Sequence, residues 1–124
     1  MPEVAAALVL YGITNCDQVK RARRWLDEHQ VSYRFHDFRR DGLRPEDLER
    51  WLQRCDWNTL INRQGTTWRS LEESARPTDA ASARRVALLQ PTLIKRPVLE
   101  DASEVLVGFS QQQYECRFGA PHGR

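Results

Sequence analysis

Apolar positions divide the first third of the chain into strand, helix and strand. Residues 8–13 (LVLYGI) form a continuous apolar run that stops at Thr14, and a run of this length predicts a buried strand of a parallel sheet. Across Val19–Leu26 the apolar residues recur at helical spacing, with Thr14 or Asn15 as the expected cap. Residues 32–38 alternate and predict a second strand. This pattern indicates a β-α-β unit.

The middle of the chain, from about residue 44 to residue 90, is expected to be a helical insertion. Pro45 suits the first turn of a helix, and four later residues share one apolar face of it. These are Leu48, Trp51, Leu52 and Cys55. A turn with a short helix is predicted at 58–65, and helices at 71–75 and 80–89. No strand pattern of comparable strength interrupts them.

Strand patterns return near the carboxyl end. Residues 92–94, 98–101 and 104–109 are apolar runs, and the last two have the spacing of a hairpin. A short helical or irregular segment follows, and residues 119–124 are expected to be disordered. The order β-α-β, helical insertion, β-β and terminal helix predicts an α/β, thioredoxin-like fold with a mixed sheet, as a single domain over residues 1–118.

Composition and charge limit the classes of binding partner that the sequence supports. Hydrophobic residues make up 40% of the 124 residues and charged residues 29%, as in soluble globular proteins. The net charge of +2 is too balanced to indicate nucleic acid or an anionic membrane as a partner, and no apolar stretch is long enough to span a bilayer. The three histidines lack metal-ligand spacing, so we expect no metal and no tightly bound cofactor. A monomer is the default expectation.

Cysteine usage indicates a reducing compartment. The three cysteines are an odd number at wide spacings, which suits neither a disulfide framework nor a zinc site. The segment Val4–Ile13 could be mistaken for the apolar part of a secretion signal. However, Glu3 stands where such a signal needs a basic residue, and Asn15, before Cys16, is not the small residue that lipid attachment needs. We therefore expect a cytoplasmic protein.

Cys16 is the strongest candidate for chemistry. It follows a strand and opens a helix, where backbone N–H groups and the helix dipole favour a thiolate. Lys20 and the nearby arginines add positive potential, whereas Asp17 opposes it. The alternative interpretation is a small core residue at a strand–helix junction, because free cysteine is often simply buried.

The other cysteines bear on how a mixed disulfide at Cys16 would be resolved. Val19 occupies the position three residues after Cys16, which excludes an intramolecular CxxC disulfide, so another thiol is required. Cys55 lies on an apolar stripe and is expected in the core. Cys116 is either an ordinary cysteine near the chain end or a second thiol able to reach another sulfur.

Two arginines are candidate anion ligands. Arg96 precedes Pro97, a candidate cis proline that would turn the chain beside the Cys16 loop. A guanidinium there is a forked donor for a carboxylate or an oxyanion, although an ordinary surface arginine before a turn explains the spacing equally well. Arg63 is a similar case. A thiolate site needs such a cation to hold an anionic partner.

Three ordered motifs resemble the arsenate reductase-like (ArsC/Spx) family. Residues 11–17 (YGITNCD) and 19–26 (VKRARRWL) resemble the family's opening, residues 62–68 its arginine-bearing loop, and residues 93–98 (LIKRPV) its Leu-Ile-x-Arg-Pro segment. The likeness runs from about Leu8 to Phe118. Within the family it is greatest with the YffB-type proteins, which are regarded as glutathione-dependent thiol reductases.

This resemblance implies a site as well as a fold. The implied fold is a thioredoxin fold with a helical insertion, and the implied nucleophile is Cys16. Arg96 is implied at the site, before a cis Pro97, and Arg63 as a further site arginine. Glutathione is implied as the co-substrate that resolves a mixed disulfide at Cys16.

Thr14 and Asn15 are expected to help hold the thiolate and glutathione.

Two departures from the family pattern bear on the alternative functions of the protein. Arsenate reductases of the family carry a third site arginine shortly after the last strand, where this chain has Gly108–Gln111 (GFSQ). Because this cation is missing, arsenate reduction is kept only as the first alternative. The transcriptional-regulator branch commonly uses a CxxC switch, which Val19 removes. The second alternative is a redox-sensing or protein-binding module without turnover, supported by an insertion larger than thiol chemistry requires.

Overall fold

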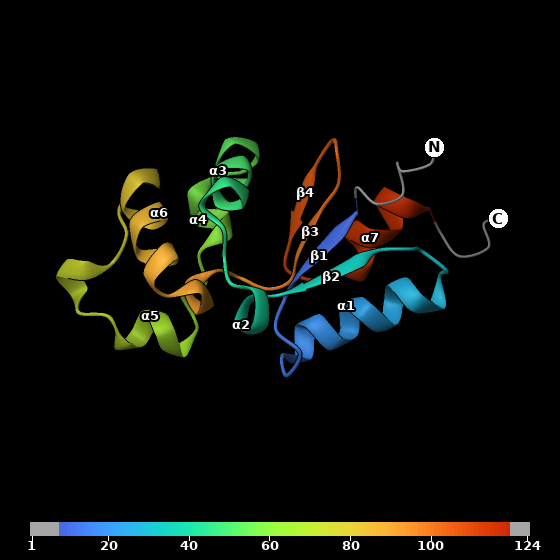
Figure 1. Cartoon of the computed structure of the whole chain (residues 1–124), viewed down its shortest axis with the longest axis horizontal. Helices are drawn as coiled ribbons and strands as arrows, with labels where there is room; N and C mark the ends of the chain where they lie inside the picture. Colours follow the sequence, from blue (N-terminus) through green and yellow to red (C-terminus); the bar gives the residue numbers. More distant parts are fainter. Residues whose placement is uncertain (1–7, 120–124) are drawn as a thin grey trace. The chain divides into compact units, whose positions relative to one another are not determined.

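The computed structural model describes residues 8–119, which form two compact units (Figure 1). The sheet unit comprises the described residues up to Asp37 together with those from Arg96 onward. The helical unit comprises Phe38–Lys95, against an expected insertion of about 44–90. The tail expected to be disordered lies, apart from Gly119, outside the described residues. None of the helices within residues 8–119 has the length and apolar character that a membrane crossing requires.

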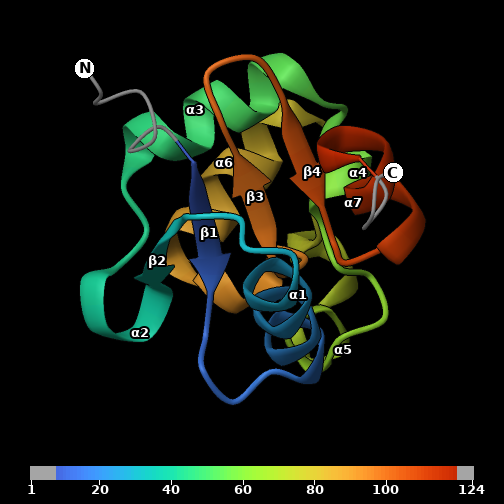
Figure 2. The same cartoon turned by 90° about the vertical axis from the view of Figure 1, so that its right-hand side faces the viewer.

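A four-stranded mixed sheet forms the sheet unit, and its strand order is β2-β1-β3-β4 (Figure 2). Its elements are β1 (Val9–Gly12), α1 (Asp17–Glu28), β2 (Arg34–Asp37), β3 (Val98–Glu100), β4 (Val105–Val107) and α7 (Gln111–Phe118). Strand β1 is parallel to β2 and antiparallel to β3, and β4 forms an antiparallel hairpin with β3. The predicted β-α-β and β-β-α halves of a thioredoxin-like fold are therefore confirmed.

One face of this sheet carries the main hydrophobic core. Leu10 lies in register with Phe35 on one side and with Leu99 on the other, so the three side chains share a face. Buried side chains of α1 and α7 pack against this row, among them Trp25 and Tyr114. Each large apolar side chain buried in this way contributes about 1.5–3 kcal/mol, which binds both helices to the same face.

The helical unit contains no strand of a sheet within its described residues. Its elements are α2 (Phe38–Asp41), α3 (Pro45–Arg54), α4 (Trp57–Leu60), α5 (Thr66–Ser70), the 3₁₀ turn η2 (Glu73–Ala75), α6 (Ala80–Leu89) and the 3₁₀ turn η3 (Pro91–Leu93). Ile61, Ala83 and Leu93 are the buried centre of one cluster in this unit. On α3, Leu48 and Trp51 are fully buried, as the predicted helical stripe requires.

A buried carboxylate anchors the start of α3. Asp47 is fully buried, and its two oxygens accept hydrogen bonds from Arg44 at 2.9 and 3.0 Å and from Arg50 at 2.6 Å. Burial alone would raise the pKa of Asp47, but the two guanidinium groups outweigh it and hold the pKa below its usual range. Asp47 therefore holds two cations against the first turn of the helix.

The structure corrects several predicted boundaries. Residues 92–94 are not a strand of the sheet, because η3 begins at Pro91, which lacks an N–H for a ladder, and Ile94 forms only an isolated bridge with Ile61. The strand predicted at 32–38 ends at Asp37, and Phe38 already belongs to a helix. The helical piece predicted at 71–75 is only the short turn η2.

One helix was missed altogether. The polar segment Thr66–Ser70 forms α5, although it contains no apolar periodicity that would indicate a helix.

Candidate functional site

Cys16 is itself the N-cap residue of α1, so the expectation that Thr14 or Asn15 caps this helix was wrong. The backbone of Cys16 is extended, at φ −105° and ψ 126°, and its carbonyl accepts the first helical hydrogen bond from Lys20 N at 2.9 Å. The thiol is free and partly buried, and it makes no capping hydrogen bond. The sulfur therefore sits where unpaired N–H groups and the positive end of the helix dipole gather.

Close packing between β1 and α1 sets the position of Cys16. A Cβ atom built on Gly12 would lie 2.6 Å from Cγ2 of Val19, so only glycine fits at the end of the strand. Val19 is fully buried. The position that holds the second cysteine in a CxxC motif is therefore a packing position here, with its side chain directed against the strand.

Arg96 and Pro97 lie at the same end of the sheet as Cys16. Strands β1 and β3 are antiparallel with Tyr11 opposite Val98, so the residues before Val98 run beside those that follow Tyr11. The Arg96–Pro97 peptide bond is cis, which confirms that prediction. Pro97 is fully buried, and Arg96 is partly buried with its Nε atom inside the protein.

The stretch that lacks the third arginine also lies at this end. Gly108 N donates to the carbonyl of Pro97 at 2.7 Å, and Gly108 has a φ of +79°, which favours glycine. Two residues later, Ser110 caps α7 by accepting a hydrogen bond from Gln113 N at 3.2 Å. This segment therefore serves as a turn and a helix cap, and it brings no cation to the site.

Arg63 belongs to the helical unit, where aromatic side chains hold its guanidinium. The Arg63 Cζ atom lies 5.5 Å from the centre of the Trp57 ring and 5.4 Å from that of Trp68. Its terminal nitrogen donates to the side-chain carbonyl of Asn58. Both tryptophans are partly buried, whereas Arg63 is exposed. The two rings and the Asn58 amide therefore fix the orientation of the Arg63 guanidinium. The sequence did not reveal this arrangement, because these residues meet across a loop without periodicity.

The Arg63 loop is tied to the segment that leads into Arg96. Asn62 N donates to the Leu93 carbonyl at 2.9 Å, and Lys95 N donates to the Leu60 carbonyl at 2.8 Å. Lys95 is the residue directly before Arg96 in the chain. Two backbone hydrogen bonds therefore join the Arg63 loop to the last residues of the helical unit.

The remaining candidates have simpler surroundings. Thr14 and Asn15 are exposed in the turn between β1 and α1. Cys55, expected in the core, is only partly buried at the end of α3, where its thiol donates to the Trp51 carbonyl at 3.2 Å. Burial, followed by the nearby Asp56 carboxylate, raises the pKa of Cys55. Cys116 is exposed on α7.

No group of three histidine, cysteine or acidic side chains within residues 8–119 is placed to hold a metal ion.

The fold and the site define a class of protein: a thioredoxin-type α/β fold in which one free cysteine opens the first helix and an arginine precedes a cis proline at the same end of the sheet. Residues 11–116 match the ArsC family, and the chain belongs to that family.

Relatives of known sequence or structure cover nearly the whole chain. An uncharacterized protein of Haemophilus influenzae is 38% identical over 112 residues, which are 90% of this chain and 98% of that one. A YffB protein of known structure is 48% identical with a TM-score of 0.84, over 88% of this chain and 96% of its own. An arsenate reductase (ArsC) related protein from Brucella melitensis is 48% identical with a TM-score of 0.72, over 92% and 96%.

The regulator branch of the family is more distant in sequence. The global transcriptional regulator Spx of Streptococcus agalactiae is 22% identical over 86% of this chain and 79% of its own length.

Proposed function

We propose that this protein is a glutathione-dependent thiol–disulfide reductase in which Cys16 is the single nucleophile. The observation that carries the proposal is the free thiol at the start of α1, at the same end of the sheet as Arg96 and the cis Pro97. The ArsC family membership and the likeness to a YffB protein support the same chemistry.

The proposed reaction has two exchange steps. In the first, the Cys16 thiolate attacks one sulfur of a glutathione mixed disulfide; a Cys16–glutathione disulfide forms, and the substrate leaves as its thiolate. In the second, the thiolate of a second glutathione attacks the glutathione sulfur on Cys16. The Cys16 thiolate is regenerated, one molecule of oxidised glutathione is released, and the proton of the attacking thiol goes to solvent. Overall, the substrate sulfur is reduced from a disulfide to a thiolate, and the sulfur of the second glutathione is oxidised from a thiolate to a disulfide. The sulfur of the first glutathione remains in a disulfide throughout.

Arg96 is proposed to hold a carboxylate of glutathione, because a guanidinium offers parallel N–H donors to such a group. Thr14, Asn15 and Pro97 are proposed to line the same binding site. Arg63 is proposed as a second carboxylate ligand, supported by its match to the family motif and by the two tryptophans that hold it. Glutathione is the only co-substrate in this scheme, and no resident cofactor or metal takes part. We place the reaction in the cytoplasm, where three free cysteines stay reduced.

The test is to incubate the reduced protein with oxidised glutathione between pH 5 and 9. Intact and peptide mass spectrometry then locate the adduct and its rate, with Cys16→Ser and the matched control Cys116→Ser. We expect glutathione on Cys16 in the wild type and in Cys116→Ser, removal of the adduct by reduced glutathione, and no comparable adduct in Cys16→Ser. Slow, unselective reaction at Cys16 would contradict the proposal and favour a protein-binding module instead.

Arsenate reduction is distinguished in the same preparation. The missing cation at Gly108–Gln111 leads us to expect no arsenate-dependent turnover with glutathione and glutaredoxin. Measurable arsenate turnover would replace disulfides with arsenate as the substrate, while Cys16 kept its role.

A further inference from the structure

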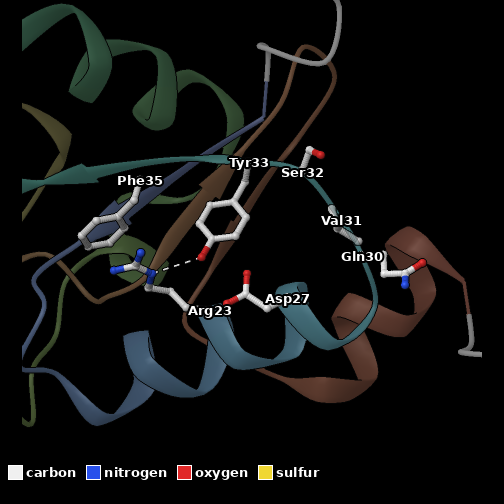
Figure 3. Close-up of a pocket in the computed structure, with 7 residues that line it drawn as sticks. All are labelled: Arg23, Asp27, Gln30, Val31, Ser32, Tyr33 and Phe35. Carbon is white, nitrogen blue, oxygen red and sulfur yellow. Dashed lines mark hydrogen bonds between the residues drawn. The ribbon is translucent and has the colours of Figure 1, made fainter.

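A pocket on the sheet unit lies between the second half of α1 and β2 (Figure 3). Arg23 and Asp27 line it from the helix, and Tyr33 and Phe35 line it from the segment that enters and forms β2. The loop of residues 30–32 closes one end. The chemistry proposed for Cys16 uses none of these residues.

Arg23 is held in this pocket by two aromatic side chains. Its Cζ atom lies 4.2 Å from the centre of the Phe35 ring, and its Nε donates to the Tyr33 hydroxyl at 3.1 Å. Across the part of the chain that the structure describes, its two terminal nitrogens make no hydrogen bond. A guanidinium oriented in this way presents unused N–H groups to a carboxylate and loses little freedom on binding it.

The pocket lies along the same side of α1 as Cys16. Cys16, Lys20, Arg23 and Asp27 follow the spacing i, i+4, i+7 and i+11, which places them on one stripe of the helix. A helix rises about 1.5 Å per residue, so Arg23 lies about 10 Å along the axis from Cys16, and Asp27 about 16 Å. An extended peptide advances about 3.4 Å per residue. Its successive side chains face opposite ways, and the side chains of a helix lean toward the helix N-terminus. The second and fourth neighbours of a peptide cysteine at Cys16, about 7 and 14 Å away, therefore face Arg23 and Asp27.

We propose that this pocket binds an acidic side chain of a polypeptide substrate, two residues away from the cysteine that undergoes exchange at Cys16. The inference rests on the proposed function and names its substrate class, a glutathionylated protein rather than a small disulfide alone. Charge complementarity supports it, because Lys20 and Arg23 precede Asp27 along the stripe. Asp27 then favours a basic residue at the fourth position and repels an acidic one.

Synthetic peptides test the pocket. Each carries one glutathionylated cysteine, with Glu or Gln two residues away and Lys or Glu four residues away, on either side of the cysteine. The release of glutathione from each peptide gives kcat/KM, and the short glutathione–mercaptoethanol disulfide, which does not extend to Arg23, reports the basal reaction. We expect about a tenfold preference for Glu over Gln at the second position on one side of the cysteine. This preference should be lost in Arg23→Gln and kept in Arg21→Gln, which removes an exposed charge from another side of the helix.

A second variant, Asp27→Lys, tests the pocket independently in case Arg23→Gln does not fold. Asp27 is exposed, and Asp27→Lys is expected to reverse the preference at the fourth position from Lys to Glu. Reduction of the short disulfide together with equal rates for the Glu and Gln peptides would overturn the pocket proposal alone. A preference that survives in Arg23→Gln would also overturn it. Absence of reaction with every substrate, the short disulfide included, would overturn the proposed function and the pocket proposal together.

Discussion

Val19 closes the space above Gly12, at the point where β1 turns towards the helix that carries Cys16. A Cβ atom at position 12 would lie 2.6 Å from Cγ2 of Val19, closer than atoms of a packed core approach. We expect Gly12→Ala to lower the free energy of unfolding by about 1–3 kcal/mol, because an overpacked contact forces strand and helix apart. Chemical denaturation of the variant measures this loss.

The matched control for this pair is the double variant. Val19→Ala removes the two methyl groups that the new Cβ would meet, so Gly12→Ala should cost clearly less in the Val19→Ala background. Equal costs in the two backgrounds would show that the contact does not govern the packing at position 12.

Trp68 is expected to act on glutathione binding through Arg63. Removal of one aromatic partner in Trp68→Leu releases the Arg63 guanidinium, and a cation–π contact at an exposed site is worth about 0.5–1 kcal/mol. We predict that KM for glutathione rises about three- to fivefold while kcat changes little. Steady-state kinetics with the short disulfide measure both constants.

A double-mutant cycle separates this effect from a loss of packing. In an Arg63→Gln background, Trp68→Leu should no longer change KM, because the group that it orients is gone. A further rise of KM in that background would assign Trp68 a role that does not pass through Arg63.

Asp47 is expected to make stability depend on acid pH. Its pKa is lowered in the folded protein, so its stabilising contribution is complete above the ordinary pKa of about 3.9 and is lost as the pH falls through the lower folded value. We predict that Asp47→Asn costs about 2 kcal/mol at pH 7, less than a fully buried pair, since the Arg44 and Arg50 side chains are 53% and 39% exposed.

Unfolding by urea at pH 7 and at successively lower pH values checks this prediction. The difference between wild type and Asp47→Asn should shrink below about pH 4, because the Asp47 carboxyl then takes up a proton in the unfolded chain before it does so in the folded protein. Glu46→Gln, an exposed neighbour on the same turn, is the control and should change stability by less than about 0.5 kcal/mol. A difference that is constant with pH would contradict the role of the charge.

Cys55 is expected to be the slowest of the three thiols to alkylate. Burial raises its pKa, and the thiol proton is engaged by the Trp51 carbonyl. Iodoacetamide labelling at pH 7.5, followed by peptide mass spectrometry, should modify the exposed Cys116 well before Cys55. Asp56→Asn removes the second cause of the shift while keeping a residue able to cap α4, and it should raise the Cys55 rate a few-fold. Equal rates at Cys55 and Cys116 would refute the prediction.

Two tyrosines form a matched test of buried hydroxyl groups. Tyr114 is fully buried, burial raises its pKa, and its hydroxyl has no hydrogen-bond partner within residues 8–119. Tyr114→Phe should therefore leave the free energy of unfolding unchanged or raise it by up to about 1 kcal/mol. The Tyr11 hydroxyl donates to Glu100 Oε1 at 3.2 Å, so Tyr11→Phe should cost about 1–2 kcal/mol. The opposite order of the two stabilities would contradict this assignment.

The strands and long helices could be predicted from sequence because each has a periodic apolar face. The run before Thr14 and the stripe of Leu48 and Trp51 became buried elements as expected. The short helix α5 could not be predicted, because it contains no such face and its position depends on contacts made by other segments. The predicted strand at 92–94 failed for a related reason, since its apolar residues fill the core of the helical unit instead of a sheet.

The candidate site likewise has a part that could be predicted from the sequence and a part that could not. Cys16 and the cis Pro97 could be identified because both stand at junctions between elements that the sequence marks clearly. The cation–π contacts of Arg23 and Arg63 could not be predicted, because each joins an arginine to aromatic residues that only folding brings together. Local sequence therefore located the thiol that we propose as the nucleophile, whereas the groups that orient the arginines became visible only in three dimensions.

The strand order of the sheet unit has a consequence for how the chain is made. Strand β1 emerges early from the ribosome, but its antiparallel neighbour β3 begins only at Val98, after the whole helical unit has been translated. The backbone N–H and C=O groups on that edge of β1 therefore have no β3 partner while residues 38–95 are being made. Because domains generally fold as units during synthesis, the helical unit is complete first, and the sheet that positions Cys16 closes last.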